Sequence, residues 1–184
     1  MNPALAEAAK NIKNAVVFKD IMENLLIRPY HPDDEKEVID LWQDCHLASP
    51  QNNPRSDIQR KLKVNPEWFL IGILEGNLVA SCMAGYDGHR GWINYLAVLP
   101  AYRHRGIATQ VLKEAERRLR AAGCPKINLQ IRETNTHTIQ FYERIGFQRD
   151  PVLSMGKRLI ADPLSSSNQI KTDQTDESTF DPER

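Results

Sequence analysis

Apolar runs separated by turn residues predict three consecutive antiparallel strands near the middle of the chain. Residues 68–74 and 78–86 are mostly apolar, and Glu75-Gly76-Asn77 between them is typical of a tight turn. A second turn opens with Asp87-Gly88, a common hairpin signal, and leads into the apolar residues 92–99. These segments therefore predict a meander of neighbouring strands.

Apolar positions at a spacing of three or four residues predict helices on both sides of this meander. Upstream, the pattern covers about 33–45 and then a short segment over 56–64. Downstream, it covers about 106–122 and 135–145, and Gly123 suits the position just after the first of these two helices. We therefore expect about four helices.

Shorter segments predict the outer strands of the sheet. Residues 25–28 are a first strand candidate. Residues 126–132 alternate between apolar and polar side chains and follow a strand–helix unit, so we expect this strand to lie parallel to 92–99. Residues 147–149 and 152–157 are expected to close the sheet. The order of elements predicts an α+β fold with a mixed sheet.

One domain over 22–162 accounts for this pattern, with a segment of different composition at each end. Residues 1–21 carry a loose helical stripe and are expected to form an N-terminal extension. The extension is either an amphipathic helix that docks on the domain or on a partner, or a weakly ordered tail. Residues 163–184 are rich in Ser, Thr, Asp and Gln, so we expect a disordered C-terminal tail.

Composition narrows the classes of function. The 184 residues include 24 Lys and Arg and 24 Asp and Glu side chains, so the formal net charge is zero. This balance argues against non-specific nucleic-acid binding, which needs an excess of basic residues. Cys45, Cys82 and Cys124 are far apart and lack metal-ligand spacing, so we expect free thiols, no metal and a cytoplasmic location. No apolar run approaches the roughly 18 residues of a membrane span, so no membrane association is expected.

A basic turn connects the third strand of the meander to the longest predicted helix. It contains Arg103, His104, Arg105 and Gly106. The first N–H groups of a helix lack partners within it, and the helix dipole adds positive charge there. Glycine lets a ligand approach the backbone, and arginine adds charge-assisted hydrogen bonds. The turn therefore either binds a phosphate or pyrophosphate, or is an ordinary strand–helix connection with solvated arginines.

Residues 103–108 read R-x-x-G-x-A, which resembles the acetyl-CoA signature Q/R-x-x-G-x-G/A of the GNAT family of N-acetyltransferases. The preceding Leu96-Ala97-Val98 and Pro100 resemble the strand that leads into this signature. The resemblance spans about 25–159 and implies the GNAT fold. That fold has a mixed central sheet of six to seven strands, about four helices, and a splayed pair of parallel strands that holds acetyl-CoA as co-substrate.

A second stretch, residues 135–147, resembles the family pattern N-x-x-A-x-x-F/L-Y-x-x-x-G-F, with Thr138 in place of the alanine. Asn135 stands where a helix begins, so capping alone explains it; the family implies a further hydrogen bond to pantetheine. Tyr142 is either a core aromatic or a proton donor. The second role is open to it because a phenol, with a pKa of about 10, is protonated at neutral pH. The family implies that Tyr142 is the general acid for the leaving thiolate.

The resemblance also implies how the cofactor is held. Pantetheine would lie between the splayed strands like an extra strand, in contact with the backbones of Leu96, Ala97 and Val98. The pyrophosphate would be surrounded by the basic turn and the start of the helix, namely Arg103, His104, Arg105, Gly106, Ile107 and Ala108. The implied reaction is direct attack by a primary amine, of a small molecule or a protein, on the acetyl thioester.

The general base is the weak point of this assignment. Many relatives carry a glutamate just before the L-x-V step, whereas residues 92–95 of this chain contain no carboxylate. Asn94 could position a water there, and Glu133, Asp87 and His89 are alternatives from loops. A non-catalytic acetyl-CoA sensor or regulatory module is therefore the rival hypothesis to an enzyme.

The hairpin over 85–92 combines Tyr, Asp, His, Arg and Trp, and it resembles a run found in a bacterial, YpeA-type subgroup of small acetyltransferases. We interpret it as a substrate-side or dimer element, which makes a homodimer an open possibility. The alternative is a structured turn with a local Asp87–Arg90 pair.

Overall fold

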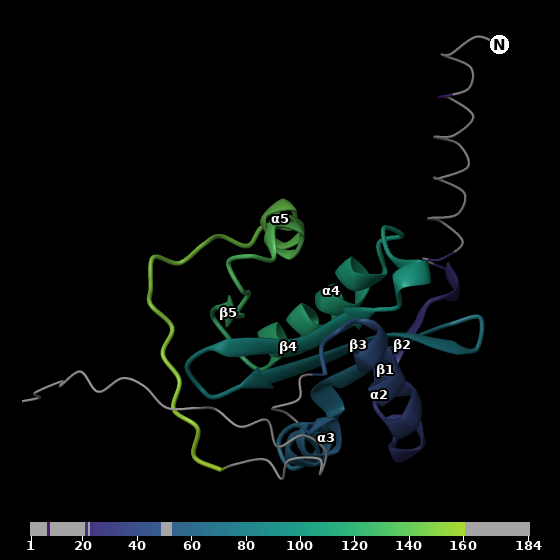
Figure 1. Cartoon of the computed structure of the whole chain (residues 1–184), viewed down its shortest axis with the longest axis horizontal. Coiled ribbons are helices and arrows are strands. Elements are labelled where there is room, and N and C mark those ends of the chain that lie inside the picture. The colour runs from purple at the N-terminus through teal and green to yellow at the C-terminus, as the bar shows by residue number, and fades with distance from the viewer. Residues whose placement is uncertain (1–6, 8–20, 22, 49–52, 161–184) are drawn as a thin grey trace, which may run out of the picture.

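In the computed structural model, which describes residues 7, 21, 23–48 and 53–160, five strands form a sheet in chain order (Figure 1). The first four pair antiparallel, and the fifth pairs parallel to the fourth. The strands are β1 (Leu26–Pro29), β2 (Phe69–Leu74), β3 (Asn77–Tyr86), β4 (Gly91–Val98) and β5 (Ile127–Asn128). The predicted meander is therefore confirmed, as β2, β3 and β4.

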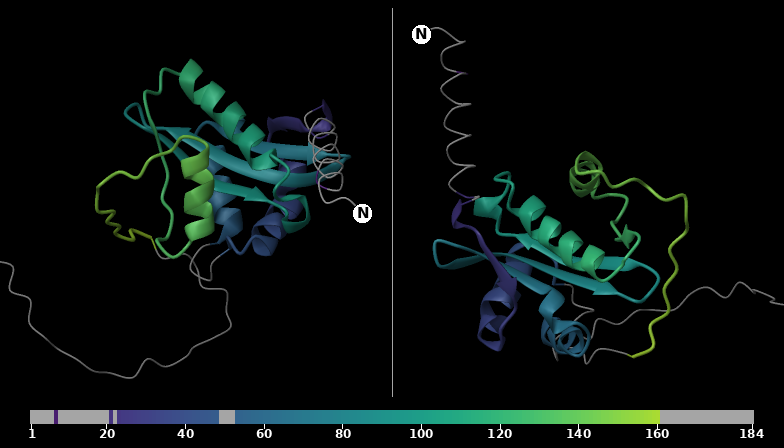
Figure 2. Two further views of the ribbon diagram at one scale, coloured as in Figure 1. Left: turned by 90° about the horizontal axis from the view of Figure 1, so that it is seen from above. Right: turned by 180° about the vertical axis from the view of Figure 1, so that it is seen from behind.

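Four α-helices in the described residues cover both faces of this sheet (Figures 1 and 2). They are α2 (Glu35–Asp44), α3 (Pro54–Leu62), α4 (Ile107–Ala121) and α5 (Thr136–Arg144). Helices α2 and α3 lie on one face, and α4 lies on the other with α5 beyond β5. Three short 3-10 helices, η1 (Pro32–Asp34), η2 (Pro66–Trp68) and η3 (Pro100–Tyr102), connect the elements.

Two apolar clusters, one on each face, hold the layers together. On the α4 face, Val111, Leu112 and Leu119 are at most 1% exposed, because they repeat at helical spacing and point at the sheet. On the other face, Trp42 of α2 and Ile58 of α3 are fully buried against β2 and β3. Burying a large apolar side chain stabilises a protein by about 1.5–3 kcal/mol, so both faces contribute to the core.

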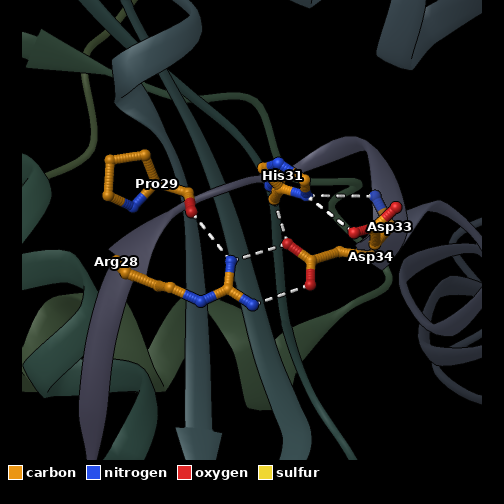
Figure 3. A network of polar contacts seen from close by, with 5 residues as sticks. All are labelled: Arg28, Pro29, His31, Asp33 and Asp34. Atoms are coloured by element: carbon orange, nitrogen blue, oxygen red, sulfur yellow. Dashed lines mark hydrogen bonds and ion pairs between the residues drawn. The ribbon is translucent and has the colours of Figure 1, made fainter.

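A bidentate ion pair joins β1 to the start of α2 (Figure 3). The guanidinium of Arg28 donates to both carboxylate oxygens of Asp34, each at 2.7 Å, and to the carbonyl of Pro29 at 2.9 Å. The backbone N–H of His31 donates to Asp34 at 2.7 Å and completes a capping box. Burial by itself would raise the pKa of Asp34, but the bonds from Arg28 and His31 outweigh it, and the pKa is lowered.

The first predicted outer strand, 25–28, is confirmed as β1, but the other predicted outer strands differ from the structure. The strand expected over 126–132 is limited to Ile127–Asn128, and neither 147–149 nor 152–157 forms a strand, so the described sheet has five strands rather than six or seven. Alternating apolar residues indicate which side chains of a segment point toward the core, but a strand also needs a neighbouring strand to pair with. The side chains of Val152, Leu153 and Met155 are accordingly 77–88% exposed.

The ends of the chain lie mostly outside the described residues, so the expected extension over 1–21 and tail over 163–184 stay predictions. Ile21 is an exception: it is 3% exposed and belongs to the apolar cluster on the α4 face. Within the described part of the chain, no helix combines the length and apolarity needed to cross a membrane. All three cysteines are free thiols, and burial raises the pKa of Cys82 to about 12.

Replacing Asp34 by Asn should lower the free energy of unfolding at neutral pH by about 1–3 kcal/mol, because the charged hydrogen bonds to Arg28 are weakened. A lowered folded-state pKa means that this contribution is complete above the ordinary carboxyl pKa. The contribution is lost as the pH falls through the lower folded-state value. Urea unfolding at a series of pH values should therefore show the two proteins converging in acid.

The matched control for this prediction is Asp40→Asn, which removes the exposed pair between Lys36 and Asp40. Exposed pairs contribute little to stability, so the control should unfold close to wild type. Equal losses in the two variants would contradict the assignment of a special role to the Arg28–Asp34 pair.

Candidate functional site

Strands β4 and β5 separate almost as soon as they meet. They pair only at Gly91 with Ile127 and at Trp92 with Asn128, and the N–H of Gly91 donates to the carbonyl of Lys126 at 2.8 Å. Beyond Trp92, the described residues provide no partner on this side of β4. The predicted site residues Leu96, Ala97 and Val98 all lie on this half-paired stretch. The structure thus contains the splayed parallel pair that the sequence led us to expect.

The basic turn follows β4 and η3 and leads directly into α4. His104 and Gly106 both adopt left-handed backbone conformations, with φ angles of 61° and 82°. Gly106 is the N-cap of α4, and no side chain caps the helix. The first N–H groups of this helix of 15 residues therefore remain available to an anion.

The side chains of the turn are arranged around this helix start. Arg103 is held back towards β4, because its Nε donates to the carbonyl of Val98 at 3.1 Å. Arg105 lies over the ring of Tyr102, 5.2 Å from the centroid. Ile107 is 1% exposed and packs in the core, so only its backbone can face a ligand. Ala108 is partly buried against the same cluster.

Asn135 and Tyr142 come from the two ends of α5. Asn135 caps the helix by accepting a hydrogen bond from the N–H of Thr138 at 3.3 Å, as the sequence predicts. The Tyr142 ring is 8% exposed and meets Phe141 and Phe147 edge to face, with centroids 5.1 and 5.2 Å away. Burial, with a smaller effect from Cys82, raises the pKa of Tyr142. The phenol therefore stays protonated over the whole neutral range.

A cleft of about 1100 Å³ links Tyr142 to the point where the strands separate. Its walls come from Trp92 of β4, from Leu119 of α4, from β5 and α5, and from residues 152–155. Residues 103–108 do not line this cleft. The structure thus brings Tyr142 and the gap between β4 and β5 together, and places the basic turn at the far end of β4.

The candidates for the general base have different surroundings. Asn94 is exposed on β4. The Asp87 carboxylate accepts from the backbone N–H groups of Arg90 and His89, at 2.7 and 2.8 Å, and from the indole of Trp92 at 3.1 Å. These bonds lower the pKa of Asp87 to about 2, which makes it a poor proton acceptor. Its contact with Arg90 is thus a backbone hydrogen bond that structures the turn. Glu133 lines the cleft.

Sequence reasoning missed the bend at Tyr95. This residue has a φ angle of 51°, and the pairing of β3 with β4 shifts register between Ser81 and Met83. A left-handed conformation is uncommon for a large aromatic residue. The sequence contains no signal for it, because aromatic residues favour regular strands.

Comparison with known proteins places the chain in a family. Residues 22–147 match the acetyltransferase (GNAT) family. An acetyltransferase of Yersinia pestis (strain Pestoides F) is 46% identical over 136 residues, which cover 74% of this chain and 96% of the relative. An acetyltransferase of Sodalis glossinidius (strain morsitans) is 49% identical over 137 residues, again 74% of this chain and 96% of the relative.

Solved structures share the fold at lower identity. Ard1 from Thermoplasma volcanium aligns with a TM-score of 0.62 and 21% identity, over 68% of this chain and 83% of that one. The aminoglycoside acetyltransferase AAC(6')-Iy, in complex with the bisubstrate analogue CoA-S-monomethyl-acetylneamine, aligns with a TM-score of 0.61 and 19% identity, over 73% of this chain and 98% of that one.

The family match and these relatives show that the chain is an acyl-CoA-dependent N-acyltransferase. It belongs to the acetyltransferase (GNAT) family, which uses acetyl-CoA.

Replacing Asn135 tests its role as the N-terminal cap of α5. Asn135→Ala should lower stability by about 1 kcal/mol, because the N–H of Thr138 loses its acceptor. Asn135→Asp keeps an acceptor oxygen and should retain wild-type stability. Thermal unfolding of both variants measures the difference, with Thr136→Ala at the next exposed position as control. A stable Ala variant would contradict the capping role.

Proposed function

We propose that this enzyme transfers the acetyl group of acetyl-CoA to a primary amine of a small molecule or a protein, with Tyr142 as general acid. The observation that carries the proposal is the course of β4. Its half-paired edge runs past Leu96, Ala97 and Val98 and leads, through the basic turn, to the uncapped start of α4. An extended, amide-rich ligand with an anionic end matches both features.

Each part of acetyl-CoA has a counterpart along this path. The amides of pantetheine pair with the free backbone edge of β4, beside Leu96, Ala97 and Val98. The pyrophosphate accepts hydrogen bonds from the first N–H groups of α4, with charge from the basic turn: Arg103, His104, Arg105, Gly106, Ile107 and Ala108. Asn135 sits next to the pantetheine, in addition to capping α5.

The chemistry follows from these positions. A neutral amine attacks the thioester carbonyl carbon, and backbone N–H groups of β4 stabilise the oxyanion that forms. The carbon–sulfur bond then breaks, and the CoA thiolate takes the proton of the Tyr142 hydroxyl. The proton that the amine loses passes to a water held by Asn94, and solvent restores the phenol. The raised pKa means that Tyr142 enters every cycle in its protonated form.

Replacing Gly106 by Trp should weaken CoA binding roughly tenfold or more, a change of about 1.4 kcal/mol in binding free energy. The side chain would cover the N–H groups that face the pyrophosphate. Gly123→Trp is the matched control, since Gly123 has a φ angle of 79° at the opposite end of α4 with open space around it. Calorimetry with CoA measures both affinities, which we expect in the micromolar range for the control. Equal affinities would place the cofactor elsewhere.

Replacing Tyr142 by Phe should lower kcat roughly 100-fold, because general acid catalysis contributes 10²–10⁴ to rate. The CoA dissociation constant should stay near that of wild type. Tyr30→Phe is the matched control, because Tyr30 is also 8% exposed and burial raises its pKa to about 12, but it lies on the opposite face of the sheet. Thiol release from acetyl-CoA with a panel of amines provides the rate.

The outcomes of this assay also separate the enzyme from its rival. An unchanged kcat in Tyr142→Phe would remove Tyr142 as the acid. CoA binding by the wild type without turnover of any amine would favour a non-catalytic acetyl-CoA sensor. The lack of a carboxylate at 92–95 is the observation behind this alternative.

A further inference from the structure

The bend in β4 at Tyr95 lies between two features of the proposed site. It follows the point where β5 leaves β4 and comes directly before Leu96, Ala97 and Val98. Left-handed backbone in a bulky residue persists only where its surroundings hold it, and such strain concentrates at functional sites. The contacts of Tyr95 show which groups hold the bend.

Side chains on the α2–α3 face of the sheet hold Tyr95 in place. The hydroxyl of Ser81 donates to the Tyr95 carbonyl at 3.0 Å and accepts from the indole N–H of Trp42 at 2.9 Å. The Trp42 ring stacks on the Tyr95 ring, with centroids 4.0 Å apart. The Tyr95 hydroxyl donates to the carboxylate of Asp57 at 2.6 Å.

Asp57 connects this strand to α3. Its second carboxylate oxygen accepts from Arg60 at 2.6 Å, one helical turn away, and its side chain is 20% exposed. The neighbouring Ile58 is fully buried in the apolar cluster on this face, so the helix holds the carboxylate at a fixed height above the sheet. Ser81 and Trp42 are buried with every polar group paired, whereas the Asp57–Tyr95 bond is the part of the network nearest solvent.

We propose that Tyr95 and Asp57 are positioning residues for acetyl transfer: through their hydrogen bond, α3 holds the bend that directs the backbone of β4 at the acetyl group. This role rests on the proposed function. Asp57 acts through Tyr95 and takes no proton itself. Small errors in the placement of reacting groups cost up to about 10²-fold in rate, so loosening the bend lowers kcat while the distant pyrophosphate contacts, and hence CoA affinity, remain.

The test compares Tyr95→Phe, Asp57→Ala and Asp57→Asn with wild type. The first two remove the hydrogen bond and should lower kcat roughly tenfold, with the CoA dissociation constant within about twofold of wild type. Asp57→Asn keeps an oxygen that can accept from the phenol and should recover most of the rate. The double variant Tyr95→Phe/Asp57→Ala should be no slower than the slower single variant, because both remove one interaction. Tyr30→Phe, which removes a phenol from the same apolar cluster, is the control.

Two results of these assays would overturn the proposal. A lower thermal stability with unchanged kcat would show that the bond is merely structural. An Asp57→Asn variant as slow as Asp57→Ala would show that the charge itself is required, which contradicts positioning.

A readout without turnover separates this proposal from the proposed function. If wild type acetylates no amine, the proposed function fails, and amide hydrogen exchange over 95–98 decides whether the bond holds the bend. Faster exchange in Tyr95→Phe and Asp57→Ala than in Tyr30→Phe supports that the bond holds the bend; equal exchange overturns it.

Discussion

The arrangement of the site depends on one constraint: β4 has a neighbouring strand, β5, along only the first part of its length. Backbone N–H and C=O groups inside a sheet need partners, and an unpaired strand edge invites another extended chain. Here β4 pairs with β3 on one side, with a register shift at the bend, while β5 leaves it after Trp92. The connection between the two strands explains this gap. The chain leaves the far end of β4, crosses through α4, and then runs parallel to β4 for only two paired residues. The gap is therefore built into the topology and does not need a specialised loop.

The two layers that cover the sheet give the two sides of this gap different characters. On the α4 side, Tyr142 sits among aromatic rings, and burial raises its pKa, so its hydroxyl stays protonated at neutral pH. On the α2–α3 side, Tyr95 is tied to Asp57 in a polar network that reaches solvent. A thioester between the layers would meet an acid from one face and an incoming amine from the other. This division matches the proposed reaction, in which the amine first adds to the thioester carbonyl carbon and the thiolate then leaves from the oxyanion intermediate.

Much of this architecture could be predicted, and the failures have physical causes. The strands β2 to β4 and the cap Asn135 follow from local signals: apolar runs, turn residues and the chemistry of helix ends. The alternation over 126–132 correctly indicates side chains that pack on the core, but only two of these residues find a strand to pair with. The bend at Tyr95 leaves no trace in the sequence, because it is imposed by groups from α2, α3 and β3 that are distant along the chain.

The order of the strands has a consequence for biosynthesis. Because the spatial order β1 to β5 equals the order in the chain, the sheet grows at one edge as the polypeptide emerges from the ribosome. The antiparallel meander needs only short loop closures and is able to form early, whereas parallel pairing must wait for the whole α4 crossover. The gap between β4 and β5 is then the last part of the sheet to form. A nascent chain interrupted before β5 would carry a folded meander whose β4 edge is open along its whole length, which exposes it to aggregation or to quality control.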